Sequence, residues 1–258
     1  MPEIEVLPLP CFREPMSSLS HLLGAVVFAA LAVVLVRRGR GDWRRTVSLA
    51  VMAFSTVQLL VLSGVYHMYW PGPLRQFMVR ADVSAVFLLI AGSLTPVHMI
   101  LFQGLARWGA LALVWTVAIF GIVLRMVFFD TVSGGAGIAI FLLFGWGGSI
   151  TAAALWQRYG WAFVRSAVLA GIAYTAGAIV LTLHRPTLVP GLVGPHELWH
   201  LAVLTGLGLH WRFVFQFASG LTSVQTPAEL ENLAAECVSL PFPKGSHGDK
   251  EDFFERAA

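Results

Sequence analysis

The sequence predicts an all-α integral membrane protein, a bundle of seven transmembrane helices with a short polar C-terminal tail. Apolar residues make up 57% of the 258 residues and charged residues only 12%, a balance far from that of a soluble domain. The apolar residues gather in runs of about 20, the length that an α-helix needs to cross roughly 30 Å of hydrocarbon. These runs lack the strict apolar-polar alternation of membrane β-strands, so a helical bundle is expected.

Seven such runs follow one another along the chain, separated by short breaks rich in Gly, Pro and Arg. The expected spans are 18–37, 45–69, 79–101, 107–128, 136–156, 162–183 and 196–217. Residues 1–17 form an N-terminal segment without a cleavable signal pattern, since the Arg cluster follows the first apolar run instead of preceding it. Residues 218–258 form the polar tail, in which Thr226-Pro227 predicts the start of one short amphipathic surface helix.

The basic residues predict the orientation of the bundle. Five belong to the face that carries the N-terminus: Arg13, Arg75, Arg80, Arg125 and Arg185. Twelve belong to the other face: Arg37, Arg38, Arg40, Arg44, Arg45, Arg107, Arg158, Arg165, Arg212, Lys244, Lys250 and Arg256. By the positive-inside rule the C-terminus is cytoplasmic and the N-terminus outside. The basic residues form no stripe interleaved with aromatic residues, so nucleic acid is not an expected partner.

Polar residues within the spans are the candidates for function. Away from the loop edges the spans hold two acidic residues, Asp82 and Glu197. An ionisable group in hydrocarbon costs roughly 2.5 to 3.5 kcal/mol on insertion scales unless a cavity, partner or ion receives it. His67 ends the second span, Asp82 begins the third, and His196 and His200 begin the seventh, so all four are expected at a similar depth near the N-terminal face.

The spacing of the histidines indicates a metal site. His196 and His200 are four residues apart, which puts both imidazoles on one helix face, and Ser63 and His67 repeat that spacing. Three neutral imidazoles with a fourth position free are typical of catalytic zinc. Asp82 could bind the metal-activated water or orient a ligand. Two further histidines, His98 and His210, lie toward the other face and are expected to be hydrogen-bonded packing residues.

The string His196-Glu197-Leu198-Trp199-His200 also satisfies the H-E-x-x-H pattern of metalloproteases, in which Glu197 would be the general base. Such enzymes usually take their third ligand from downstream. Here the next acidic residue is Glu229, in the tail, and the better third ligand, His67, lies upstream. An intramembrane protease is therefore the weaker interpretation.

Four motifs in order resemble those of the hemolysin III family, a bacterial family related to the progestin and adiponectin receptors. They are Glu14-x-x-Ser17-x-x-Ser20-His21-x-x-Gly24, Ser63-Gly64-Val65-Tyr66-His67, Asp82-x-Ser84-Ala85-x-Phe87-Leu88-Leu89-Ile90-Ala91-Gly92-Ser93-x-Thr95-Pro96 and His196-Glu197-Leu198-Trp199-His200. The resemblance extends over all seven expected spans. The chain departs from the family at Ser17, where Asn is common, and at Val83, where His is frequent.

The resemblance implies zinc held by His67, His196 and His200, with Asp82 and Ser63 beside the water that the metal activates. Glu14, His21 and Glu197 are expected to lie behind these residues. A more distant likeness to the alkaline ceramidases implies hydrolysis of a lipid amide, with Asp82 as general base and Ser63 positioning water or stabilising the oxyanion. The implied partners are membrane lipids, either ceramide-like or fatty-acyl, and the implied location is the bacterial plasma membrane.

Two other functions stay open. The zinc could be structural in a receptor or sensor of the membrane state, and the family's name suggests a pore-forming cytolysin, although a uniformly apolar bundle with few lining charges makes a poor pore. The related receptors also imply a metal near the cytoplasmic face. Charge counting puts that face outside, and it is the count that the orientation given above follows.

Overall fold

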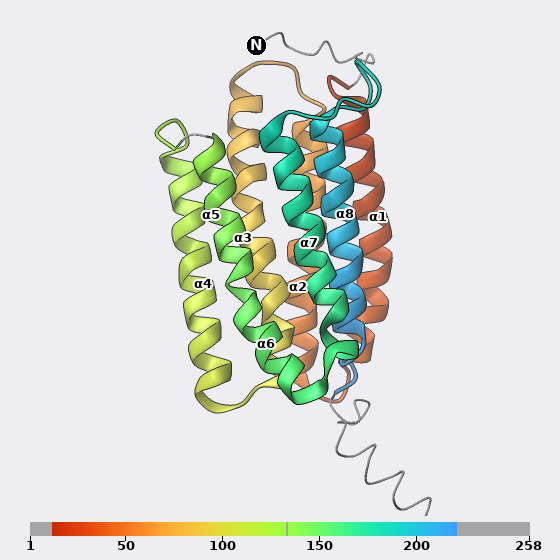
Figure 1. Ribbon diagram of the computed structural model, residues 1–258, viewed down its shortest axis with the longest axis vertical. Coiled ribbons are helices and arrows are strands. Elements are labelled where there is room, and N and C mark those ends of the chain that lie inside the picture. Colours follow the sequence, from red (N-terminus) through yellow and green to blue (C-terminus); the bar gives the residue numbers. More distant parts are fainter. Residues whose placement is uncertain (1–11, 133, 221–258) are drawn as a thin grey trace, which may run out of the picture. The chain divides into compact units, whose positions relative to one another are not determined.

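The computed structural model describes residues 12–132 and 134–220, which form eight α-helices packed lengthwise (Figure 1). The helices are α1 (Pro15–Arg38), α2 (Trp43–Tyr66), α3 (Pro73–Leu101), α4 (Gly104–Val127), α5 (Gly134–Trp146), α6 (Gly148–Tyr159), α7 (Trp161–Leu183) and α8 (Pro195–Phe215). This part of the chain contains no strand beyond one isolated bridge between Val189 and Val193. The amphipathic helix expected after Thr226 lies outside the described residues.

Within the described residues, six helical segments are long and apolar enough to cross a membrane: α1, α2, α3, α4, α7 and the segment Gly134–Tyr159 that α5 and α6 form together. Their outer faces leave large apolar side chains exposed, among them Leu23, Val26, Phe120 and Ile150. Lipid solvates such a surface, and helices satisfy their own backbone hydrogen bonds within it. The chain is therefore an all-α, multi-pass membrane protein.

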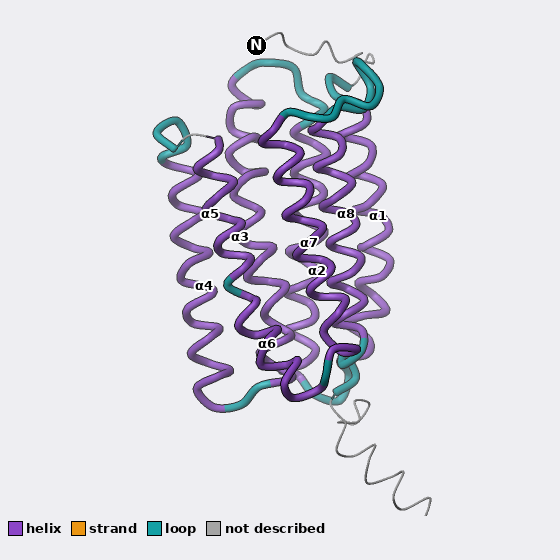
Figure 2. Tube along the Cα trace, viewed as in Figure 1, coloured by secondary structure: helices purple, strands orange, loops and turns teal. Residues whose placement is uncertain are grey.

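The segment expected as one span over 136–156 is two helices in the structure. Helix α5 ends at Trp146 and α6 begins at Gly148, so the short break falls at Gly147 (Figure 2). Glycine is a weak helix former, and Gly145, Gly147 and Gly148 cluster here. The apolar pattern continues through the break, which is why hydropathy alone indicates a single helix.

Helix α8 lies beside α1 and α7 along the length of the bundle but is not one of the six apolar segments (Figure 1). Its 21 residues extend about 31 Å at 1.5 Å per residue, which is long enough to span. Its three histidines, together with Glu197 and Arg212, lower its mean hydropathy. A long helix that is not among the six apolar segments thus carries two of the predicted ligands.

The first two helices approach closely near the candidate site. A Cβ atom added at Gly64 would lie 2.7 Å from Cγ of Leu22, so a larger residue would push α1 and α2 apart. The Ser18 hydroxyl donates a hydrogen bond of 2.7 Å to the Gly64 carbonyl at the same place. The start of α1 is therefore held against the end of α2, next to Ser63 and His67.

Candidate metal centre

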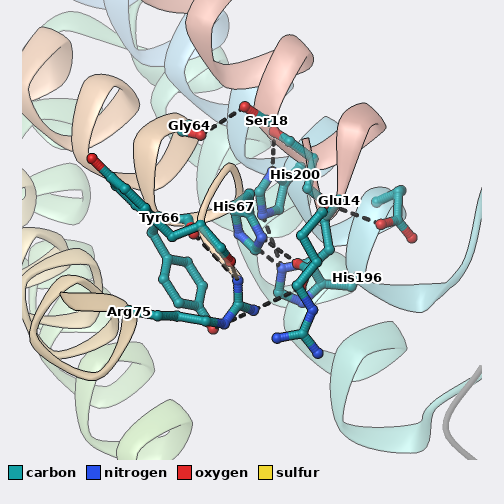
Figure 3. A network of polar contacts seen from close by, with 12 residues as sticks. Glu14, Ser18, Gly64, Tyr66, His67, Arg75, His196 and His200 are labelled. Carbon is teal, nitrogen blue, oxygen red and sulfur yellow. Dashed lines mark hydrogen bonds and ion pairs between the residues drawn. The ribbon is translucent and has the colours of Figure 1, made fainter. Parts of the chain in front are cut away.

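Three histidine side chains converge at the end of the bundle where α1, α3 and α8 begin and α2 ends (Figures 1 and 3). The Nε2 atom of His196 lies 3.2 Å from Nε2 of His67 and 3.1 Å from Nε2 of His200. Zinc–nitrogen bonds of about 2.0 to 2.1 Å at a tetrahedral angle would separate two ligand nitrogens by about 3.3 Å. His67 and His200 are buried and His196 half-buried. These three side chains could hold a metal ion.

Hydrogen bonds on the outer nitrogens orient two of the rings. His67 uses Nδ1 to donate to the Glu14 carboxylate, and His200 uses Nδ1 to donate to the Ser17 carbonyl at 3.2 Å. A neutral imidazole carries one N–H, so the Nε2 atoms of both residues present lone pairs inward. His196 Nε2 can offer one proton at most and cannot satisfy both lone pairs. A cation at the point that the three nitrogens face satisfies them all.

Glu14 and Arg75 form an ionic support behind His67 (Figure 3). Arg75 donates to the Glu14 carboxylate at 2.6 Å and to the Tyr69 carbonyl at 2.7 Å, and its guanidinium lies 4.4 Å from the centroid of the Tyr66 ring. Burial alone would raise the pKa of the Glu14 carboxyl, but the hydrogen bond from His67 and the positive charge of Arg75 lower that pKa to about 2. Glu14 therefore stays ionised at neutral pH and keeps the His67 ring in one tautomer.

Glu197 joins α1 to α8. Its Oε1 atom accepts a hydrogen bond of 2.8 Å from the Ser17 hydroxyl, and its Oε2 atom accepts one of 2.9 Å from the Gly194 backbone N–H, the acidic half of a capping box. Both carboxylate oxygens are thus engaged away from the histidine nitrogens. This arrangement favours a structural part for Glu197 over that of the general base in a metalloprotease.

His21 lies directly against one of the candidate ligands. Its ring stacks on that of His200 with centroids 3.8 Å apart and planes 16° apart. The side chain is buried, and among the described residues neither ring nitrogen has a hydrogen-bond partner. His21 also lines the cavity beside the histidines, so it packs against His200 at the wall of that cavity.

The same cavity receives Asp82 and Ser63. It has a volume of about 480 Å³ and reaches from His196 and His200 to His210 near the far end of α8. Both residues line the cavity, and the half-buried Asp82 carboxylate is close enough to the Ser63 hydroxyl for the two to interact. Apolar side chains from α3, α5, α7 and α8 cover most of the wall of this cavity.

The three predicted ligands thus lie in one cluster, and the predicted water-side residues Asp82 and Ser63 line the cavity beside it. Glu14 contacts His67 and His21 stacks on His200, whereas the side-chain partners of Glu197 are Ser17 and Gly194. Sequence reasoning treated Arg75 as a topology charge, although it supports Glu14. Its position just after the break Pro71-Gly72-Pro73, beside the end of α2, was the available signal. Ser17 was quoted in the first motif and as a departure from the family, and no role was predicted for it, yet it contacts both His200 and Glu197.

Fold and site together define a class: a multi-pass helical membrane protein with three histidines at one end of the bundle that could hold a metal ion. The sequence profile of the family described as Haemolysin-III related matches residues 10–211, and the chain belongs to that family. The resemblance drawn from the four motifs is therefore confirmed.

Two curated relatives support the assignment. The chain is 28% identical to "Hemolysin-3" of Bacillus cereus over 196 residues, which are 75% of this chain and 86% of that protein. It is 25% identical to "Hemolysin-3 homolog" of Bacillus subtilis (strain 168) over 196 residues, 75% of this chain and 89% of that one. Both similarities extend over most of each protein.

Proposed function

We propose that this protein is a zinc-dependent hydrolase of acyl amides dissolved in the membrane. One observation carries the proposal: three histidine nitrogens face a single point at the wall of a cavity of about 480 Å³ that also receives a carboxylate and a hydroxyl. Metal ligands, a proton acceptor and an apolar chamber are the parts that such a reaction needs.

The donor set favours zinc. Neutral imidazoles suit zinc among the available metals, and a set of three leaves a coordination position for a reactant. The outer hydrogen bonds from His67 to Glu14 and from His200 to Ser17 are the support that zinc-binding histidines usually have. Zinc at this point would lower the pKa of water and polarise a carbonyl.

The side chains at the cavity wall would divide the remaining work. Asp82 takes a proton from the attacking water while the water oxygen bonds to the amide carbon. Asp82 then returns the proton to the leaving nitrogen when the C–N bond breaks. The products are a fatty acid and an amine. Ser63 has one hydroxyl proton, which it donates to the Asp82 carboxylate while that group is ionised. Once Asp82 has taken the proton of water, the Ser63 hydroxyl can turn and donate to the oxygen on which negative charge develops.

The shape of the cavity supports a lipid reactant. Val86, Leu89, Phe141 and Val203 belong to its wall and present apolar atoms to a chain that extends from the histidines toward the far end of the bundle. An acyl chain enters such a space from the bilayer without exposing apolar surface to water. The proposed reactants are therefore fatty-acyl amides, ceramide-like lipids included.

A decisive assay measures fatty acid released from N-acyl lipids by the purified, zinc-loaded protein. Removal of the base by Asp82→Asn should lower turnover by about 100-fold or more, and Ser63→Ala by a smaller factor, with metal content retained in both. Asp130→Asn, an exposed carboxylate at the same end, is the matched control and should leave turnover unchanged.

A second function has an observation in its favour. The candidate ligands come from α2 and α8, and their outer partners Glu14 and Ser17 come from the start of α1, so a bound metal would tie three helices together. That arrangement suits a receptor or sensor with a structural zinc. It would be supported if zinc removal lowered the unfolding temperature while none of the acyl amides was hydrolysed by the loaded protein.

We also propose that α8 is the seventh span and that the protein resides in the bacterial plasma membrane with its C-terminus in the cytoplasm. The length of α8 and the excess of basic residues on the face opposite the N-terminus support this placement. Labelling of a tag at each terminus in intact cells tests it. An externally accessible C-terminal tag would reverse the orientation.

A further inference from the structure

Arg125, near the end of α4, is a buried cation. Its side chain is 4% exposed, and its guanidinium lies 4.6 Å from the centroid of the Phe129 ring. One terminal nitrogen donates to the Val132 carbonyl at 3.2 Å, whereas Nε has no partner among the described residues. A cation withdrawn from water in a membrane protein needs a counter-charge or a functional reason for its position.

No carboxylate in residues 12–132 and 134–220 forms an ion pair with Arg125. The five carboxylates of this part of the chain have other partners. Glu14 binds His67 and Arg75, Asp42 caps α2, Asp82 interacts with Ser63, Asp130 pairs with Arg80 and Glu197 bonds Ser17 and Gly194. The charge of Arg125 is therefore not neutralised within these residues.

The position of Arg125 relates it to the candidate metal centre. Both line the same cavity. Arg80, two residues before Asp82 on α3, donates to the carbonyl of Met126, the residue after Arg125, at 3.3 Å. Arg125 thus lies at about the depth of Asp82, on the side of the cavity formed by α4 and α5.

The wall of α5 leaves room for the guanidinium. A Cβ atom added at Gly137 would lie 3.2 Å from the Cζ atom of Arg125, so the planar group rests against bare backbone. Arg125 lines the cavity and its Nε has no hydrogen-bond partner among the described residues, so the guanidinium keeps donor capacity beside the cavity. A guanidinium recognises carboxylate and phosphate oxygens through paired N–H donors, and it does so more strongly where water is excluded.

We propose that Arg125 binds an anionic group of the molecule that enters this cavity. This proposal rests on the proposed function and names its substrate class: acyl amides whose amine part carries a carboxylate or a phosphate. The scissile carbonyl would lie toward the histidines and the acyl chain along the apolar wall. Neutral ceramide-like amides would bind more weakly because they leave the guanidinium unpaired.

Binding to the zinc-loaded, full-length Asp82→Asn protein tests the proposal without turnover. The probes are N-oleoylglycine, N-oleoylethanolamine and its O-phosphate, which share one acyl chain and present a carboxylate, no charge and a phosphate. The anionic probes should bind at least about tenfold more tightly than the neutral one, the lower end of what hydrogen bonds to a charged group contribute. The carboxylate and phosphate arms show which acid the site prefers.

Substitution assigns the preference to one side chain. In the same background, Arg125→Gln should abolish the preference for both anionic probes while the neutral probe binds as before, and Arg125→Lys should keep part of it. Arg185→Gln, an exposed arginine at the same end of the bundle, is the matched control and should leave the preference intact.

Equal affinity for all three probes, or a preference that survives Arg125→Gln, would overturn the proposal. Loss of neutral-probe binding in Arg125→Gln would overturn it as well, since Arg125 would then support the cavity and not the anion. Failure of the proposed function looks different: wild-type protein would hydrolyse none of the three amides, while the preference that depends on Arg125 remained.

Discussion

The two ends of this bundle bury the same residue type in different ways. At the far end, His98 contacts the Ala106 carbonyl at 3.1 Å and the Thr151 hydroxyl at 3.2 Å, and His210 contacts the Ser93 carbonyl at 3.2 Å. At the N-terminal end, His67 and His200 use Nδ1 in the same way, but their Nε2 atoms face His196. Neighbours bond both ring nitrogens of His98 and Nε2 of His210, whereas at the N-terminal end the lone pairs of two rings face a third ring.

The comparison separates a packing histidine from a candidate ligand by the partner of its second ring nitrogen. Burial alone does not, because His98, His67 and His200 are all buried. The partner of the second ring nitrogen is what distinguishes the two kinds of histidine. The Thr151 hydroxyl bonds the second nitrogen of His98, so both nitrogens of that ring have partners. Where the second nitrogen faces another imidazole nitrogen that also carries a lone pair, a cation can fill the position between them.

Removal of a candidate ligand should give the largest contrast between the two ends. His200→Ala should weaken zinc binding by more than about 100-fold, the upper end of the loss that removal of an outer partner causes. His98→Ala, the matched change at the far end, should leave zinc affinity unchanged. Competition with a chelator of known affinity measures both. Equal losses in the two variants would erase the distinction between the ends.

Loss of the charge behind His67 should have a smaller effect. Glu14→Gln keeps a hydrogen-bond acceptor for Nδ1 but removes the carboxylate that Arg75 also binds, so zinc affinity should fall by about 10- to 100-fold. The same competition assay applies, with Asp130→Asn as the control. An unchanged affinity in Glu14→Gln would mean that the ionic support has no part in metal binding.

The smallest effect should come from the packing histidines. His98→Ala removes contacts to Ala106 and Thr151, and hydrogen bonds between membrane helices average about 0.6 kcal/mol, so the free energy of unfolding should fall by about 1 kcal/mol. Unfolding of the metal-free protein in detergent with a denaturant measures this change. A loss of several kcal/mol would show that the far end has a role beyond packing.

Much of the candidate site could be predicted from sequence because depth and helical spacing are both visible there. The ends of even spans and the starts of odd spans lie at the same face of the membrane. The sequence therefore predicts a common depth for His67, Asp82, His196 and His200. The partners of these residues depend on side-chain direction, which spacing does not fix. Glu197 therefore resembled a catalytic base in its motif, although its oxygens bind Ser17 and Gly194.

The remaining surprises arise where hydropathy averages over a detail. Arg125 was counted as a charge at the membrane edge, because a count of basic residues does not reveal that Gly137 makes room for a buried guanidinium. The break between α5 and α6 at Gly147 was invisible for the same reason, since the residues on both sides are apolar.

X-ray absorption at the zinc edge of the purified wild-type protein shows whether the three histidines bind zinc. We expect about one zinc per chain with three imidazole nitrogens at about 2.0 to 2.1 Å and one further light atom, and loss of one imidazole in His196→Ala. Folded protein purified without chelators that contains no zinc, or zinc with ligands that His196→Ala leaves unchanged, would contradict this expectation.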